Sequence, residues 1–291
     1  MKLTQEQKDE IRELARAYVN RFPSQAKAAT SLKGIISTGT LSTLLNGKYE
    51  AISDEMFLRL RAQVSVRSSA EWQICQTQMY CELMTLLEDA QEYQNVAWAI
   101  APAGSGKTTA ARLYVAQREN AFLVSCSEDM RRGDFIREMA RTVGIDVGDM
   151  SLRMALDKTI KYLQTLDQPL LIFDEGDKLS DAVLYYFITI YNALEGHCGL
   201  FFISTHYIRR RMEIGLAYNK KGYDEIHSRI CRKFVELTPT SEFDVAAVAR
   251  ANGIADERTL RTVVKDAISC RCDLRRVRRE VHKQKRIAGI V

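Results

Sequence analysis

The residues best suited to chemistry form one short run, Ala101-Pro-Ala-Gly-Ser-Gly-Lys-Thr-Thr109. It follows the apolar stretch 96–100 and leads into residues 110–117, which have the composition of a helix. Glycines between a strand and a helix N-terminus let the main chain approach a phosphate closely. The backbone N–H groups and the helix dipole then favour its negative charge. The run therefore predicts a site for the phosphates of a nucleotide.

Residue types within this run have distinct expected roles. We expect Lys107 to reach the β- and γ-phosphates of ATP, and the Thr108 hydroxyl to bind Mg²⁺. The run fits the pattern G-x-x-x-x-G-K-[ST] except at its first position, where Ala101 replaces glycine. That position turns the chain more than it touches phosphate, so alanine should be tolerated. The other residues expected to contact the nucleotide are Ala103, Gly104, Ser105, Gly106 and Thr109.

Two acids end a second apolar stretch, Leu170-Leu-Ile-Phe-Asp-Glu175. We expect Asp174 to hold Mg²⁺ through its water shell, and Glu175 to orient and polarise the attacking water. Strands often end in acidic residues, so this motif alone is weak evidence for a catalytic site. It gains weight because it lies about 65 residues after the glycine-rich run, with one helix–strand–helix block between.

Thr205 and Arg229 complete the expected catalytic set. Thr205 follows the apolar stretch 199–204. We expect this strand to lie between the strand that precedes the glycine-rich run and the strand that ends in Asp174. Thr205 is our choice for sensing the γ-phosphate, with His206 second. Arg229 would reach from a neighbouring subunit and neutralise charge on the γ-phosphate, with Arg232 as the alternative. The competing interpretations are a strand-end cap for Thr205 and a solvated basic turn for the arginines.

Alternating strands and helices must position these residues. Such alternation builds a parallel sheet with helices on both faces, and ligands bind at the carboxyl ends of its strands. After Pro239 the strand signals vanish, and three helical stretches predict a small α-helical lid over residues 239–291. Arg275, at the start of the last helix, would report the γ-phosphate to this lid. The expected strands are residues 96–100, 121–125, 169–173, 199–204 and 233–237, and a helical segment over 72–93 leads to them.

The first 66 residues predict a separate all-α domain, followed by a linker at 66–71 and the core over 67–238. Its helical stretches are 4–19, 24–30, 38–47 and 52–64. They resemble the helix-turn-helix of the phage-repressor superfamily, which implies that the third stretch enters the major groove of double-stranded DNA. A protein-interaction module is the alternative. The residues expected to meet DNA are Thr38, Thr40, Ser42 and Thr43, with Lys48 near phosphates.

Basic clusters outside the expected core offer further contacts to DNA phosphates. Arg131 and Arg132 follow the second strand, and residues 209–211 with Lys220 and Lys221 bracket a segment that we expect to be rich in loops. In a ring or helical filament such loops would follow a DNA backbone without reading its sequence. Between residues 271 and 286 there are eight Lys or Arg against two acids, an excess that suits DNA phosphate or an acidic partner.

Composition places the chain among ordinary globular proteins. Apolar residues make up 46% and charged residues 27% of the 291 residues, with a formal net charge of +5. No apolar run approaches the roughly 18–20 residues that cross a bilayer, and the N-terminus lacks the apolar core of a signal peptide. The seven scattered cysteines predict reduced thiols, mostly in the core. We therefore expect a cytoplasmic protein with no membrane partner.

The order of the glycine-rich run, Asp174-Glu175, Thr205, Arg229 and Arg275 resembles the AAA+ ATPases over residues 72–291. The preceding helix-turn-helix and the segment 72–79 make the chain similar to the Mu-phage transposition protein B family. The resemblance implies ATP-driven self-assembly on DNA and delivery of that DNA to an integrase-type transposase, which stimulates hydrolysis. The departures are Ala101 and the Ser-Thr-His at 204–206, where a clear Asn is missing.

Two other functions fit the same residues. One is a loader that remodels a replicative helicase, although such proteins usually lack this kind of N-terminal domain. The other is a helix-turn-helix transcriptional regulator in which the nucleotide only switches conformation. Binding to one DNA sequence would favour the regulator, and binding that depends on length but not on sequence would favour the transposition protein.

Overall fold

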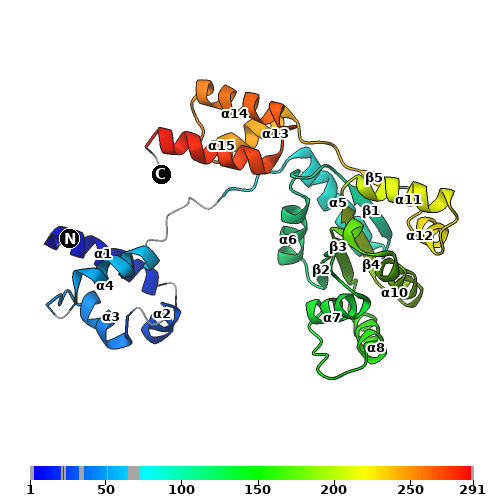
Figure 1. Cartoon of the computed structure of the whole chain (residues 1–291), viewed down its shortest axis with the longest axis horizontal. Coiled ribbons are helices and arrows are strands. Elements are labelled where there is room, and N and C mark those ends of the chain that lie inside the picture. The colour runs from blue at the N-terminus through cyan, green and yellow to red at the C-terminus, as the bar shows by residue number, and fades with distance from the viewer. Residues whose placement is uncertain are drawn as a thin grey trace. The chain divides into compact units, whose positions relative to one another are not determined.

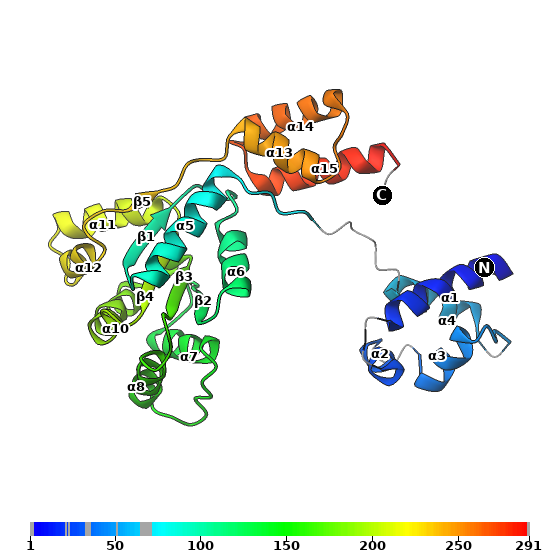
Figure 2. The ribbon, with the colours of Figure 1, turned by 180° about the vertical axis from the view of Figure 1, so that it is seen from behind.

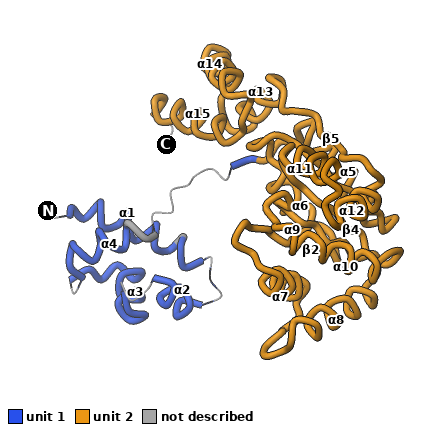
Figure 3. Tube along the Cα trace, turned by 45° about the vertical axis from the view of Figure 1, so that its right-hand side comes forward, with its two compact units in different colours: residues 1–73 blue, residues 74–291 orange. Residues whose placement is uncertain are grey.

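The computed structural model describes residues 3–20, 22, 24–32, 36–50, 52–64 and 72–289. They form two compact units, residues 1–73 and 74–291 (Figure 3). The predicted linker 66–71 lies outside the described residues.

In the described part of the first unit, four helices form a bundle (Figure 1). Their N-termini are capped by side chains, for example by the Ser37 hydroxyl, which accepts a hydrogen bond from the Thr40 N–H at 3.1 Å. Ile11, Leu41 and Phe57 lie in one buried core. Helical stretches were predicted close to all four. The helices are α1 (Gln5–Val19), α2 (Gln25–Ser31), α3 (Thr38–Leu45) and α4 (Asp54–Val64).

The second unit is built on a five-stranded parallel sheet of order β2-β3-β4-β1-β5. The predicted parallel α/β fold is therefore confirmed, and β4 does lie between β1 and β3. The strands are nearly continuous apolar runs because helices cover both faces. They are β1 (Val96–Ile100), β2 (Ala121–Ser125), β3 (Leu170–Asp174), β4 (Gly199–Ser204) and β5 (Val235–Glu236).

Helices lie on both sides of this sheet (Figures 1 and 2). Each side has its own hydrophobic core. One is made with α5 (Gln78–Glu92) and α6 (Lys107–Gln117). The other is made with the helices that follow β2, β3 and β4. Those helices are α7 (Arg132–Thr142), α8 (Leu152–Leu163), α9 (Asp181–Leu184), α10 (Tyr186–Leu194), α11 (Tyr207–Ala217) and α12 (Tyr223–Arg229).

Three helices follow the sheet, as predicted. α13 (Glu242–Ala251), α14 (Glu257–Ser269) and α15 (Leu274–Ile287) contact one another. A side chain caps each of them, and for α15 the cap is the Asp273 carboxylate, which accepts from the Arg275 N–H at 2.8 Å. Among the described residues, no helix is both long and apolar enough to cross a membrane.

Three expectations from the sequence are wrong. The segment after Thr205 is not rich in loops, because α11 and α12 occupy most of residues 207–229. Residues 72–77 have no regular secondary structure, and the helix begins only at Gln78, after the capping hydroxyl of Thr77. Of the seven cysteines only Cys126 and Cys198 are buried, so the thiols are mostly outside the core.

Candidate active site

The glycine-rich run forms a tight loop between β1 and the first turn of α6. Gly104 (φ 77°) and Gly106 (φ 100°) lie in the left-handed region, which glycine adopts without the steric cost that a Cβ brings. Gly106 is also the N-cap of α6 and offers no side chain to bond the first N–H groups of the helix. Free N–H groups at a helix N-terminus suit an anion.

Lys107 lies at the base of this loop and is buried. Its Nζ donates to the Ala101 carbonyl at 2.9 Å and to the Pro102 carbonyl at 2.7 Å. Burial lowers the pKa of Lys107, while the negative charge of Asp174 acts in the opposite direction. The ammonium group is thus held inside the loop that we expect to hold the phosphates.

Asp174 ends β3 and is 4% exposed. Burial raises the pKa of its carboxyl, and the neighbouring Glu175 charge adds to this, whereas a hydrogen bond from the Thr108 hydroxyl lowers it. A buried carboxylate beside a hydroxyl is an oxygen donor set of the kind Mg²⁺ prefers. Thr108 and Asp174, the two residues predicted to bind metal, therefore lie side by side. Their oxygens could bind Mg²⁺ together with the phosphate oxygens of ATP.

Glu175 and Thr205 follow the adjacent strands β3 and β4. The Glu175 backbone is left-handed (φ 59°), and its carboxylate accepts from the Lys178 Nζ at 2.7 Å. The Thr205 hydroxyl donates to the Asp177 carboxylate at 2.6 Å. Both predicted residues thus border the loop that begins at Glu175, and their roles toward water and the γ-phosphate remain predictions.

The lid meets the phosphate loop at the start of α15. The Leu274 N–H donates to the Gly104 carbonyl at 3.0 Å. A Cβ at Gly104 would lie 2.2 Å from the Asp273 carboxylate carbon, so only glycine permits this close approach. The positive charge of Arg275 contributes to lowering the pKa of Lys107. Arg275 therefore lies close enough to Lys107 for their charges to interact, and its sensing role stays a prediction.

The two candidate arginines for a neighbouring subunit differ in their surroundings. Arg229 on α12 donates through Nη2 to the Asn192 Oδ1 at 2.8 Å, and its guanidinium lies over the Tyr191 ring. Arg232 is more exposed and pairs with Asp224 at 2.9 Å. Both arginines stay predictions for the contact with a neighbouring subunit.

The residues predicted to bind DNA lie in both units. On α3 the Thr43 hydroxyl donates to the Gly39 carbonyl, and Thr38 is exposed. Arg131 and Arg132 are exposed at the start of α7. Thr40 and Ser42 are partly buried on α3, while Lys48, Lys220 and Lys221 are exposed. Lys220 already pairs with Asp181.

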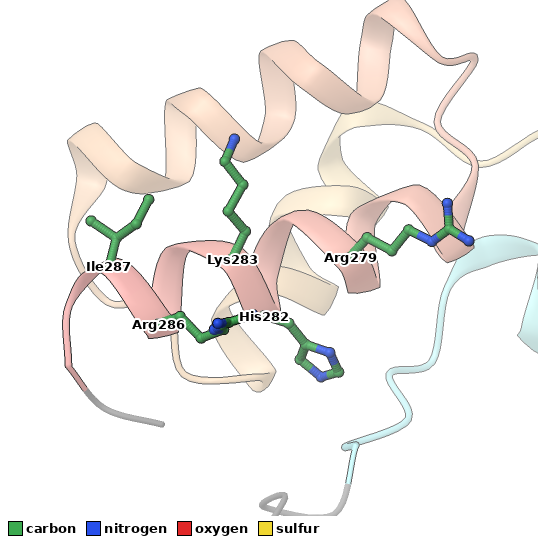
Figure 4. A pocket seen from close by; sticks show the side chains of 5 residues that line it. All are labelled: Arg279, His282, Lys283, Arg286 and Ile287. Atoms are coloured by element: carbon green, nitrogen blue, oxygen red, sulfur yellow. The ribbon is translucent and has the colours of Figure 1, made fainter.

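A basic surface pocket lies on α15 (Figure 4). The side chains shown in the figure all come from this one helix, which carries most of the predicted basic excess of residues 271–286. The lining residues are Arg279, His282, Lys283, Arg286 and Ile287.

A polar cluster that follows Asp174 and Glu175 was not predicted from the sequence. Arg211 was predicted to lie in a surface basic cluster, yet this side chain is 14% exposed and pairs with Asp181 at 2.6 Å. The signal that would have found it is the helical spacing of Ile208, Met212 and Gly215, which are all buried. That spacing predicts a helix whose inner face carries Arg211.

Comparisons with known proteins support the family resemblance that was predicted from the sequence. Residues 90–212 match the family model described as an AAA domain. Over 240 residues the chain is 26% identical to the ATP-dependent target DNA activator B of Escherichia phage Mu, covering 79% of this chain and 74% of that protein. The activator B of Escherichia phage D108 gives the same values. The Mu-like prophage FluMu DNA transposition protein B of Haemophilus influenzae is 25% identical over 237 residues, covering 78% of this chain and 80% of that protein.

Proposed function

We propose that this chain, an AAA-domain protein that resembles the target DNA activator B proteins of Mu-like phages, is a DNA-dependent ATPase that prepares target DNA for transposition. The observation that carries the proposal is the joining of Lys107, Thr108 and Asp174 at one end of the sheet, inside the residues that match an AAA domain. The relatives named as ATP-dependent activators cover the same region and most of the rest.

Each residue of the site has a separate role in the proposed hydrolysis of ATP. The N–H groups of the loop and Lys107 bind the phosphates. Thr108 and Asp174 would hold Mg²⁺, which when bound would supply positive charge beside the transferred group. Glu175 orients the attacking water and accepts its proton. Thr205 and Arg275 respond to the γ-phosphate from β4 and from the lid.

DNA binding and assembly are the finer parts of the proposal. The domain of residues 1–66 acts as a helix-turn-helix domain and contacts DNA through α3. It is followed in the same chain by the ATPase core (67–238) and the lid (239–291). Copies assemble on double-stranded DNA as a ring or filament with little sequence preference, and Arg229 or Arg232 completes the neighbouring site. The assembly delivers that DNA to an integrase-type transposase in the cytoplasm.

An ATPase assay tests this proposal. Phosphate release should rise when a random-sequence duplex is added, and a second duplex of equal length and unrelated sequence should stimulate it equally. The physical reason is that contacts to the DNA backbone depend on phosphate charge and not on base sequence. Hydrolysis that is absent with every duplex, or stimulated by one sequence alone, would contradict the proposal.

A further inference from the structure

Arg211 on α11 makes contacts of an unusual kind for a residue in a basic run. Its guanidinium donates from Nη1 to the Asp177 carbonyl at 3.1 Å and to the Leu179 carbonyl at 2.6 Å. Nη2 donates to the Asp181 carboxylate at 2.6 Å. One side chain therefore holds three points of the segment that directly follows Glu175.

Two further side chains close this cluster. The Tyr223 hydroxyl, at the start of α12, donates to the Asp181 Oδ1 at 2.7 Å and accepts from the Arg211 Nε at 3.1 Å. Burial alone would raise the pKa of Asp181, but hydrogen bonds from Lys220, Arg211 and Tyr223 outweigh it and hold the pKa at about 2. The carboxylate is therefore charged throughout the physiological range, so the cluster is a fixed support and not a pH switch.

The same segment is held from its other side by the end of β4. The Asp177 N–H donates to the Ser204 Oγ at 3.1 Å, and the Thr205 hydroxyl donates to the Asp177 carboxylate. The Trp98 Nε1 of β1 also donates to the Ser204 Oγ, at 2.9 Å. Residues 175–181 are thus anchored between β4 and α11.

This anchoring matters because the Glu175 backbone is left-handed, a conformation that costs a non-glycine residue free energy. Glu175 makes local hydrogen bonds with Asp174 and Lys178. The contacts from α11 that hold the residues after it are those of Arg211 with Asp177, Leu179 and Asp181. We infer that Arg211 is a positioning residue, which holds the 175–181 segment so that the Glu175 carboxylate faces the nucleotide. The inference rests on the proposed role of Glu175 in hydrolysis.

Arg211→Lys is the discriminating variant, because an ammonium group cannot reproduce the planar fork that spans two carbonyls and a carboxylate. Arg250→Lys is the matched control, since Arg250 makes an exposed ion pair with Glu257 at 2.8 Å in the lid. In Arg211→Lys we expect kcat to fall about tenfold or more, because misplacing a catalytic group by about 1 Å can cost about 100-fold. The Kd of a fluorescent ATP analogue should stay within about twofold, because Arg211 makes its hydrogen bonds to residues 177–181 and to Tyr223 and not to the phosphate loop.

Amide hydrogen exchange supplies a second measurement that does not depend on turnover. Exchange in the peptide covering residues 175–181 should accelerate in Arg211→Lys and stay unchanged in Arg250→Lys. Tyr223→Phe removes one hydroxyl of the cluster without changing the shape of the core, and should shift kcat and exchange in the same direction by less. If Arg211→Lys does not fold, Tyr223→Phe still tests the inference.

Two results would overturn the inference. One is unchanged exchange and kcat in the Arg211 and Tyr223 variants. The other is a decrease in nucleotide affinity, kcat and Tm together in these variants, which would show that Arg211 has a general structural role. A wild-type protein that binds ATP but does not hydrolyse it would count against the proposed function alone, because the exchange comparison would still decide what Arg211 does.

Discussion

Replacing Lys107 with alanine should weaken ATP binding by about 10- to 150-fold. The buried ammonium group is held inside the phosphate loop, and a hydrogen bond that involves a charged group contributes about 1.5–3 kcal/mol. Titration of a fluorescent ATP analogue would measure the effect. The loss of a positive charge from the loop leaves its N–H groups as the remaining attraction for the phosphates.

Lys158→Ala provides the control for that experiment, because Lys158 is exposed on α8. It should bind the analogue as the wild type does. Circular dichroism should show both variants folded. If Lys107→Ala retains wild-type affinity, the assignment of residues 101–109 to the phosphate site is wrong.

Replacing Glu175 with glutamine should leave ATP binding intact and slow hydrolysis about 100-fold or more, the range attributed to general bases. The amide keeps the size of the side chain but cannot accept a proton from water. Since the proposed assembly is released by hydrolysis, the variant should also stay on DNA in the presence of ATP. Phosphate release and the dissociation rate from a labelled duplex measure the two effects.

A matched variant, Glu119→Gln, changes an exposed acid just before β2, at the opposite end of the strands from the site. It should hydrolyse ATP at the wild-type rate. Normal turnover by Glu175→Gln would show that another group positions the water, and the neighbouring Asp177 would then be the first to test.

The sheet and the phosphate loop were predictable because their signals are local. Strands 96–100, 121–125 and 199–204 were predicted with the bounds that the structure has, since parallel strands buried on both faces are short apolar runs between polar turns. The glycines, Lys107 and Thr108 lie in one contiguous run, so their meeting needs no knowledge of the tertiary fold. The same holds for the acids that end β3.

What could not be predicted depends on residues far apart in the chain. Arg211 lies in a run of three arginines, and only the docking of α11 against the 175–181 segment makes it a buried partner of Asp181. The approach of Asp273 to Gly104 likewise joins the lid to a loop that precedes it by more than half of the chain. The helical spacing around Arg211 indicates that its side chain faces inward, but nothing near it in the sequence identifies Asp181 as its partner.

The measurement that tests the central claim most directly is fluorescence anisotropy of a long random-sequence duplex, titrated with the protein in ATP, in ADP and without nucleotide. The account predicts cooperative binding in ATP alone, tighter on longer duplexes because more copies assemble side by side. Equal binding in all three conditions, or binding that requires one particular sequence, would contradict the account and favour a DNA-binding regulator.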